Sequence, residues 1–156
     1  MTKHKGIYFV DGSAITGDLY HSAYAIFKNK RIIKQIVIPK KFNVYEIESM
    51  AMMDCILLAK EDGIIHCDNQ QIVRELNNKQ EPKDIKFYLK AIHLIKSKNL
   101  KIVWIKRDKN LAGIYLEKRL AKIKGKYLNK GKYDDGKDLK MLNRLDPKNK
   151  VKGGKN

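Results

Sequence analysis

The chain has 156 residues, of which 34 are lysine or arginine and 17 are aspartate or glutamate, so that its formal net charge is +17. This length suffices for one domain with a sizeable core. A basic excess of this size predicts attraction to polyanions, with nucleic acid ahead of an anionic membrane because no amphipathic or long apolar segment is found; the alternative is a lysine-rich, solvated surface. No secretory leader and no long apolar segment is found, which argues against membrane insertion and predicts a cytoplasmic protein. The two cysteines, Cys55 and Cys67, lie in apolar segments without metal-site spacing and are predicted to be reduced core residues.

The first part of the chain predicts three strands. An apolar run at residues 7–10 ends abruptly at Asp11, and strand-like segments follow at residues 22–28 and 31–38. Their short connections predict an antiparallel meander. A carboxylate at the end of a buried strand is costly unless a cation or a hydrogen-bond donor meets it, so Asp11 predicts a binding partner.

A helix is predicted for residues 44–62, with Gly63 as its C-cap. One side of this helix is polar and is expected to face water, through Glu46, Ser49 and Asp54. Glu48 lies on the opposite side, among the small and apolar residues that pack on a sheet, Ala51, Met52 and Cys55. A carboxylate within a packed stripe predicts a ligand site at the sheet edge, and the alternative is a glutamate that reaches solvent or helps to cap the helix.

The second part of the chain alternates strands with helices. Strands are predicted at residues 64–67 and 100–105, and because helices precede both, they should run parallel to the first strand. Asp68 follows the earlier of the two and is placed to cap a helix that reaches Leu76. Two further helices are predicted at residues 83–96 and 111–124.

The domain is predicted to span residues 1–124, followed by a basic extension at residues 125–156. The extension is rich in lysine, glycine, asparagine and aspartate, with at most one short helix. We expect it to be mobile unless a partner orders it, and to contact phosphates.

The order of elements predicts an α/β fold with a five-stranded mixed sheet, in which strands 1-2-3 are antiparallel and strands 1-4-5 are parallel, flanked by helices. Strands 1 and 4 would lie side by side, so that Asp11 and Asp68 end at the same edge and Glu48 lies over it. Three convergent carboxylates form an oxygen-rich set suited to hard divalent cations such as Mg²⁺.

Residues 7 to about 122 resemble the ribonuclease H family, type 1. The resemblance is carried by four motifs in order: Asp11-Gly12-Ser13, Glu48-Ser49-Met50-Ala51, Asp68-Asn69-Gln70-Gln71, and Trp104-Ile105-Lys106-Arg107 with Asn110 and Ala112 after it. It implies an endonuclease that hydrolyses the RNA strand of RNA/DNA hybrids with two Mg²⁺ or Mn²⁺ ions. Asp11, Glu48 and Asp68 would be the metal-binding and catalytic carboxylates, and two such ions activate a water and neutralise the leaving 3′ oxygen.

Substrate contacts are expected from polar and basic residues near these motifs. Asn69 and Gln70 adjoin the site and are candidates for contacting phosphate or sugar. Discrimination of RNA requires recognition of the 2′-hydroxyl, for which Ser13 and Asn43 are candidates. Substrate-binding candidates also occur in the loop after the last strand, at Lys106 and Arg107. We expect the protein to act as a monomer.

Two features depart from the family pattern. Family members carry a fourth carboxylate early in the last helix, where this sequence has Gly113, and Glu117 lies one turn further along the same helical face as a candidate replacement. The histidine usual in the preceding loop is absent, since residues 106–109 are Lys, Arg, Asp and Lys. Glu46 also competes with Glu48, because the spacing from Asn43 to Glu46 matches the family better.

These departures leave three functions open. The first is the ribonuclease itself. The second is a catalytically weakened nucleic-acid-binding or interaction module with the same fold, and the third retains the metal site but acts on another substrate, as related exonucleases and resolvases do.

Overall fold

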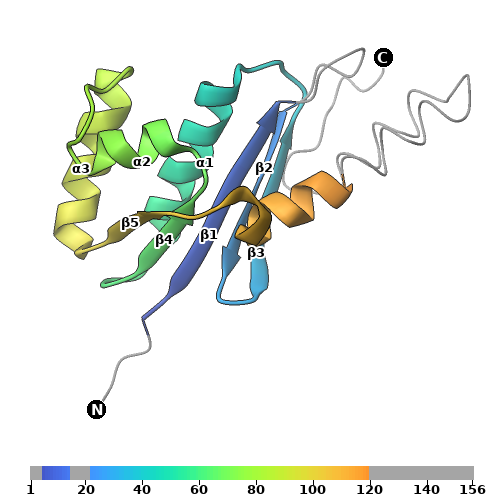
Figure 1. Cartoon of the computed structure of the whole chain (residues 1–156), viewed down its shortest axis with the longest axis horizontal. Helices are drawn as coiled ribbons and strands as arrows, with labels where there is room; N and C mark the ends of the chain where they lie inside the picture. Colours follow the sequence, from blue (N-terminus) through green and yellow to red (C-terminus); the bar gives the residue numbers. More distant parts are fainter. Residues whose placement is uncertain (1–4, 15–21, 120–156) are drawn as a thin grey trace, which may run out of the picture.

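The computed structural model describes residues 5–14 and 22–119, and the predicted basic extension lies outside these residues. The elements are β1 (Ile7–Ala14), β2 (Ser22–Lys28), β3 (Arg31–Ile38), α1 (Val44–Leu58), β4 (Ile64–Cys67), α2 (Gln70–Leu76), α3 (Ile85–Lys98), β5 (Lys101–Trp104) and the 3-10 turn η2 (Arg107–Lys109). A last helix has its described part at residues 111–119 (Figure 1, orange). None of the helices in the described ranges has the length and apolar character that crossing a membrane requires.

The predicted mixed sheet is confirmed. Its strand order is β3-β2-β1-β4-β5. β1 pairs with β2 and β2 with β3 in antiparallel fashion, whereas β4 is parallel to both β1 and β5. Val10 pairs with Cys67, so the residues that follow each of them, Asp11 and Asp68, lie at the same edge of the sheet.

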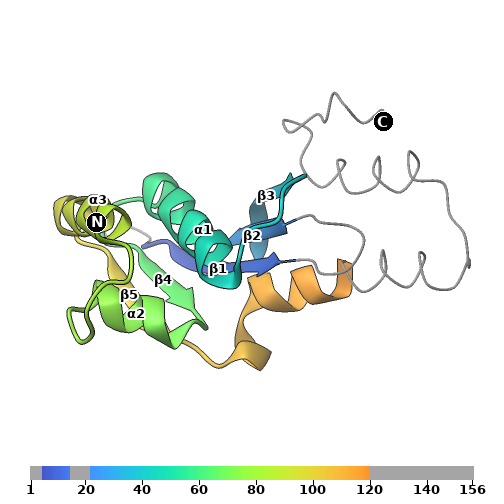
Figure 2. The ribbon, with the colours of Figure 1, turned by 90° about the horizontal axis from the view of Figure 1, so that it is seen from above.

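Successive side chains of a strand point to opposite faces of the sheet, and each face packs in its own hydrophobic core. Tyr8 and Val10 belong to the larger core, which is formed with α1, α2 and α3. Phe9 packs on the smaller core, to which the last helix contributes Ala112 and Leu116. Figure 2 shows α1 and the last helix on opposite sides of β1. The edge that carries Asp11 therefore lies between two helical layers.

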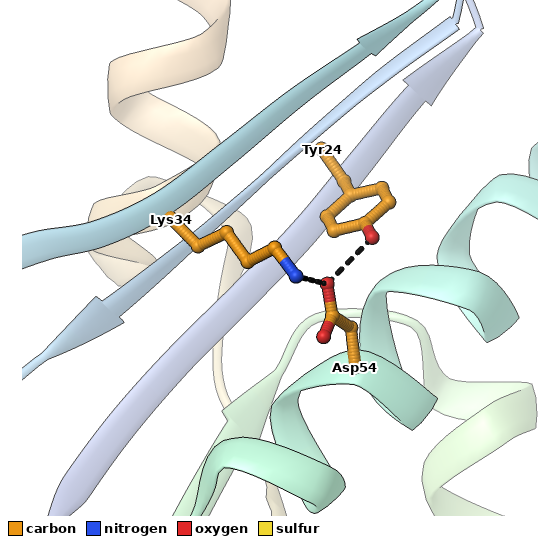
Figure 3. Close-up of polar contacts among 3 residues, drawn as sticks. All are labelled: Tyr24, Lys34 and Asp54. Atoms are coloured by element: carbon orange, nitrogen blue, oxygen red, sulfur yellow. Dashed lines mark hydrogen bonds and ion pairs between the residues drawn. The ribbon is translucent and has the colours of Figure 1, made fainter. Parts of the chain in front are cut away.

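A polar contact joins α1 to the antiparallel half of the sheet. The Asp54 carboxylate accepts a hydrogen bond from Tyr24 Oη at 2.6 Å and forms an ion pair with Lys34 Nζ at 2.8 Å (Figure 3). The prediction that Asp54 and Ser49 face water was wrong, because Asp54 contacts β2 and β3, and Ser49 lines a hollow together with Phe87 of α3. Ser49 is buried, with 7% of its surface exposed.

α1 ends at Leu58, four residues before the predicted end, and Gly63 is not its C-cap. The cause is a tertiary contact: Lys98 Nζ donates to the carbonyl oxygens of Ile56, Leu57 and Ala59 at 2.8, 2.8 and 2.9 Å, which satisfies the end of the helix. Gly63 is required for a different reason. A Cβ atom there would lie 3.0 Å from both the carbonyl oxygen of Lys60 and Cε1 of Tyr8.

Candidate metal centre

Three carboxylates from separate elements meet at the sheet edge. Asp11 lies in β1, Asp68 directly follows β4, and Glu48 lies in the second turn of α1. One carboxylate oxygen from each residue lies within 4.8 Å of the others. Gly12 makes this approach possible, because a Cβ atom there would lie 2.9 Å from the carbonyl oxygen of Ile47. The missing side chain lets the backbone of α1 rest against β1 beside Asp11.

Asn69 connects Glu48 to the start of α2. Its Oδ1 accepts a hydrogen bond from the Ile72 amide at 3.0 Å, so Asn69 is the N-cap of this helix. The prediction that Asp68 is the cap was wrong, because the next residue is equally suited to capping and occupies the position. The Nδ2 of Asn69 donates to Glu48 Oε2 at 3.0 Å.

Asn110 holds Asp68 in a similar way. This asparagine is fully buried, and its Nδ2 donates to Asp68 Oδ2 and to the carbonyl oxygen of Val10, both at 3.0 Å. Its Oδ1 accepts a hydrogen bond from the Ala112 amide at 3.1 Å at the start of the last helix. Trp104 Nε1 donates to the carbonyl oxygen of Asp68 at 3.3 Å. The sequence indicated Asn110 only as part of a motif. Its hydrogen-bond partners belong to β1 and to the residue after β4, which are distant in the chain, so they become known only from the structure.

The structure separates the two competing glutamates of α1. Glu46 forms a capping box with Asn43: the Glu46 amide donates to Asn43 Oδ1 at 2.8 Å, and the Asn43 amide donates to Glu46 Oε1 at 3.0 Å. Glu48 lies in the carboxylate cluster and is only 8% exposed. The side chain of Asn43, a candidate for substrate contact, is thus engaged in capping.

Burial and mutual repulsion disfavour full ionisation of the cluster. The pKa of Asp11 is raised to about 9, first by burial and then by the charges of Asp68 and Glu48, while the Arg107 guanidinium lowers it. Burial likewise raises the pKa of Glu48 to about 6, which the hydrogen bond from Asn69 partly offsets. Glu48 Oε1 is buried, and no donor among the described residues meets it in full hydrogen-bond geometry, although hydrogen bonding from the Asp11 carboxyl and the Gly12 amide also lowers the pKa of Glu48. A buried acceptor in this state matches the requirement of a cation.

Gly113 lies against the cluster, whereas Glu117 does not. A Cβ atom on Gly113 would lie 3.3 Å from Asp11 Oδ2 and 3.5 Å from Asp68 Oδ2. A side chain at this position would therefore enter the cluster directly. Glu117 is exposed and is not part of the three-carboxylate group.

The remaining candidates surround the cluster. Ser13 is half-buried in β1, two residues after Asp11 and hence on the same face of the strand. Gln70 is exposed in the first turn of α2, where its Oε1 accepts a hydrogen bond from Arg74 Nη2 at 3.3 Å. Lys106 and Arg107 are exposed at the start of η2, between β5 and Asn110.

Solved structures share this fold. LC11-RNase H1, isolated from compost by a metagenomic approach, superposes with a TM-score of 0.57 and 18% identity, covering 74% of this chain and 98% of that one. The N-terminal RNase H domain of a Mycobacterium tuberculosis protein gives a TM-score of 0.56 and 16% identity, covering 72% and 94%. RNase H1 of Halobacterium salinarum gives 0.55 and 14%, covering 74% and 99%. No family model and no curated protein matches the sequence. The chain therefore has the ribonuclease H fold.

The raised pKa of Asp11 predicts how the stability of the metal-free protein depends on pH. The folded-state pKa of Asp11, about 9, lies above the usual value of 3.8, so the folded protein favours the protonated carboxyl. The folded state is therefore destabilised relative to the unfolded state as the pH rises from about 3.8 to about 9. In the presence of a chelator, the unfolding temperature of the wild type should therefore fall relative to that of Asp11→Asn as the pH increases. Thermal unfolding monitored by circular dichroism measures this, and parallel profiles for the two proteins would contradict it.

The position of Gly113 predicts a reversal of stability on metal addition. Asp and Asn have nearly the same shape, but only Asp adds a fourth carboxylate to the cluster. In a chelator, Gly113→Asp should unfold at a lower temperature than Gly113→Asn because of like-charge repulsion. In Mg²⁺ or Mn²⁺ the order should reverse, since the ion gains a ligand. An equal difference between the variants under both conditions would show that residue 113 does not reach the ion.

Proposed function

We propose that this protein is a metal-dependent endonuclease that hydrolyses the RNA strand of RNA/DNA hybrids. The observation that carries the proposal is the cluster of Asp11, Glu48 and Asp68, in which one carboxylate oxygen of each residue lies within 4.8 Å of the others in a partly buried site. The cluster lies where the parallel pairing of β1 with β4 ends, after Val10 and Cys67, and the carboxyl ends of parallel strands are the usual position of ligand sites in such sheets. A structure with the same fold, that of LC11-RNase H1, was solved in complex with an RNA/DNA hybrid.

The donor set matches Mg²⁺ or Mn²⁺ and not a softer metal. All three side chains offer oxygen, and no histidine or cysteine belongs to the group found among the described residues. We infer that Asp11, Glu48 and Asp68 hold two divalent ions, which when bound supply an activated water and neutralise the leaving 3′ oxygen. The chain's own contribution is positional: the side-chain amides of Asn69 and Asn110 donate to Glu48 Oε2 and Asp68 Oδ2 and orient these carboxylates.

The charge of the chain supports a nucleic-acid substrate. The excess of 34 basic over 17 acidic residues attracts a phosphate backbone. Lys106 and Arg107 are exposed beside the cluster, so their cations are available to flanking phosphates. We propose that Ser13, two residues from Asp11, and Gln70, at the start of α2, contact the sugar and phosphate, with discrimination through the 2′-hydroxyl.

One observation favours a second candidate function. With glycine at position 113 and Glu117 exposed, the cluster has three carboxylates and no fourth among the described residues. A protein of this kind could retain the fold and bind a hybrid while hydrolysing it weakly or not at all.

Cleavage of labelled duplexes tests both functions. With Mg²⁺, the wild type should cut the RNA strand of a hybrid internally, and should cut duplex DNA of the same sequence far less. Glu48→Gln and Asp68→Asn should lower the rate by more than about 100-fold, because removing a ligand costs more than removing a residue that only orients one. Glu46→Gln is the matched control and should cut at the wild-type rate, since Glu46 lies in the capping box.

Undiminished cleavage by Glu48→Gln and Asp68→Asn would refute the assignment of the metal centre. Tight binding of the hybrid without cleavage by the wild type would favour the binding module. Preferential cutting of DNA would favour the third function, a retained metal site with another substrate.

A further inference from the structure

We propose that Asn69 is a positioning residue of the metal centre, which orients Glu48 through its side-chain amide. The proposal rests on the proposed function, because it assigns to Asn69 a role in binding the ions held by the three carboxylates. It replaces the direct substrate contact that the position of Asn69 beside Asp68 had indicated.

The orientation of the Asn69 amide is fixed from two sides. Its oxygen accepts the hydrogen bond of the Ile72 amide, so its NH₂ group must point the other way, where it donates to Glu48 Oε2. The backbone of Asn69 is also held, since its backbone N–H donates to the buried Cys67 Sγ at 3.4 Å. The start of α2 thereby becomes a rigid support for a side chain on α1.

The contact leaves one oxygen of Glu48 for a ligand. Oε2 accepts the hydrogen bond from Asn69, whereas Oε1 is buried and no donor among the described residues meets it in full hydrogen-bond geometry. A carboxylate held by one oxygen cannot rotate freely about its last torsion.

Capping alone does not explain an asparagine at this position. Serine and aspartate cap helices about as well as asparagine. A serine hydroxyl lies too close to the backbone to reach Glu48, and an aspartate would add a fourth negative charge to the cluster. Only asparagine among these caps both accepts from Ile72 and donates to Glu48. The side chain of Asn110 acts in the same way: its Oδ1 accepts a hydrogen bond from the Ala112 backbone amide, and its Nδ2 donates to Asp68 Oδ2.

Two substitutions separate capping from positioning. Asn69→Ser retains a capping oxygen but loses the donor to Glu48, whereas Asn69→Ala loses both. We expect both variants to bind Mn²⁺ about tenfold or more weakly than the wild type, as is usual when a residue that orients a metal ligand is removed. Only Asn69→Ala should also lose substantial thermal stability in a chelator. Free Mn²⁺ measured by electron paramagnetic resonance gives the dissociation constant without any activity assay.

Asp84→Ala serves as the control. Asp84 caps α3 through the Lys86 and Phe87 amides at 3.1 and 3.2 Å and is not part of the carboxylate group. This variant should lose stability and retain wild-type Mn²⁺ affinity. Wild-type affinity in Asn69→Ser would overturn the proposal and leave Asn69 as a cap alone.

Asp68→Asn distinguishes failure of this inference from failure of the proposed function. If the wild type does not bind Mn²⁺, or Asp68→Asn binds it equally well, the metal centre itself is refuted and the role of Asn69 with it. If Asp68→Asn loses binding while Asn69→Ser retains it, only the positioning role fails.

Discussion

The mutual repulsion of three partly buried carboxylates is the constraint on which the site depends. Asp11, Glu48 and Asp68 are brought within 4.8 Å of one another although burial raises the pKa of two of them. The surroundings sustain this arrangement: Gly12 lets α1 approach β1, Asn69 donates to Glu48 Oε2, and Asn110 donates to Asp68 Oδ2. Such a concentration of acceptors is unfavourable in a metal-free protein and becomes favourable once cations are bound.

The cluster has the opposite sign to the rest of the chain. Three carboxylates lie in a protein of formal charge +17, with Arg107 close enough to lower the pKa of Asp11. A phosphate backbone is attracted by the basic surface but repelled by the cluster, unless divalent cations lie between them. Under the proposed function, this pairing of a basic chain with an acidic centre would link substrate binding to metal binding, as phosphodiester hydrolysis by metal ions requires.

The sequence predicted those features that depend on local pattern and chain order. The ends of two apolar runs identified Asp11 and Asp68, and the crossovers through helices gave the parallel half of the sheet. The prediction that the first strand ends at Val10 was wrong, because pairing with β2 continues β1 through Asp11 to Ala14. Features that depend on tertiary partners were missed. Lys98, 40 positions beyond Leu58, ends α1, and Tyr24 and Lys34 draw Asp54 from solvent. The sequence could not decide between Asp68 and Asn69 as the N-cap of α2, because both residue types cap helices equally well. In the structure Asn69 is the cap, and Asp68 accepts a hydrogen bond from Asn110. Glu117 was predicted as a fourth carboxylate because it lies on the same helical face as Gly113. A shared face does not bring a side chain one turn further along the helix within contact distance of the cluster, and Glu117 is not part of it.

A crystal structure of the protein with Mn²⁺, with anomalous scattering measured near the manganese absorption edge, tests the central claim most directly. The account predicts anomalous density between the carboxylates of Asp11, Glu48 and Asp68, with the Asn69 amide still bonded to Glu48. Density bound by Glu46 or Glu117 in place of Glu48, or no density at this edge at saturating Mn²⁺, would contradict it.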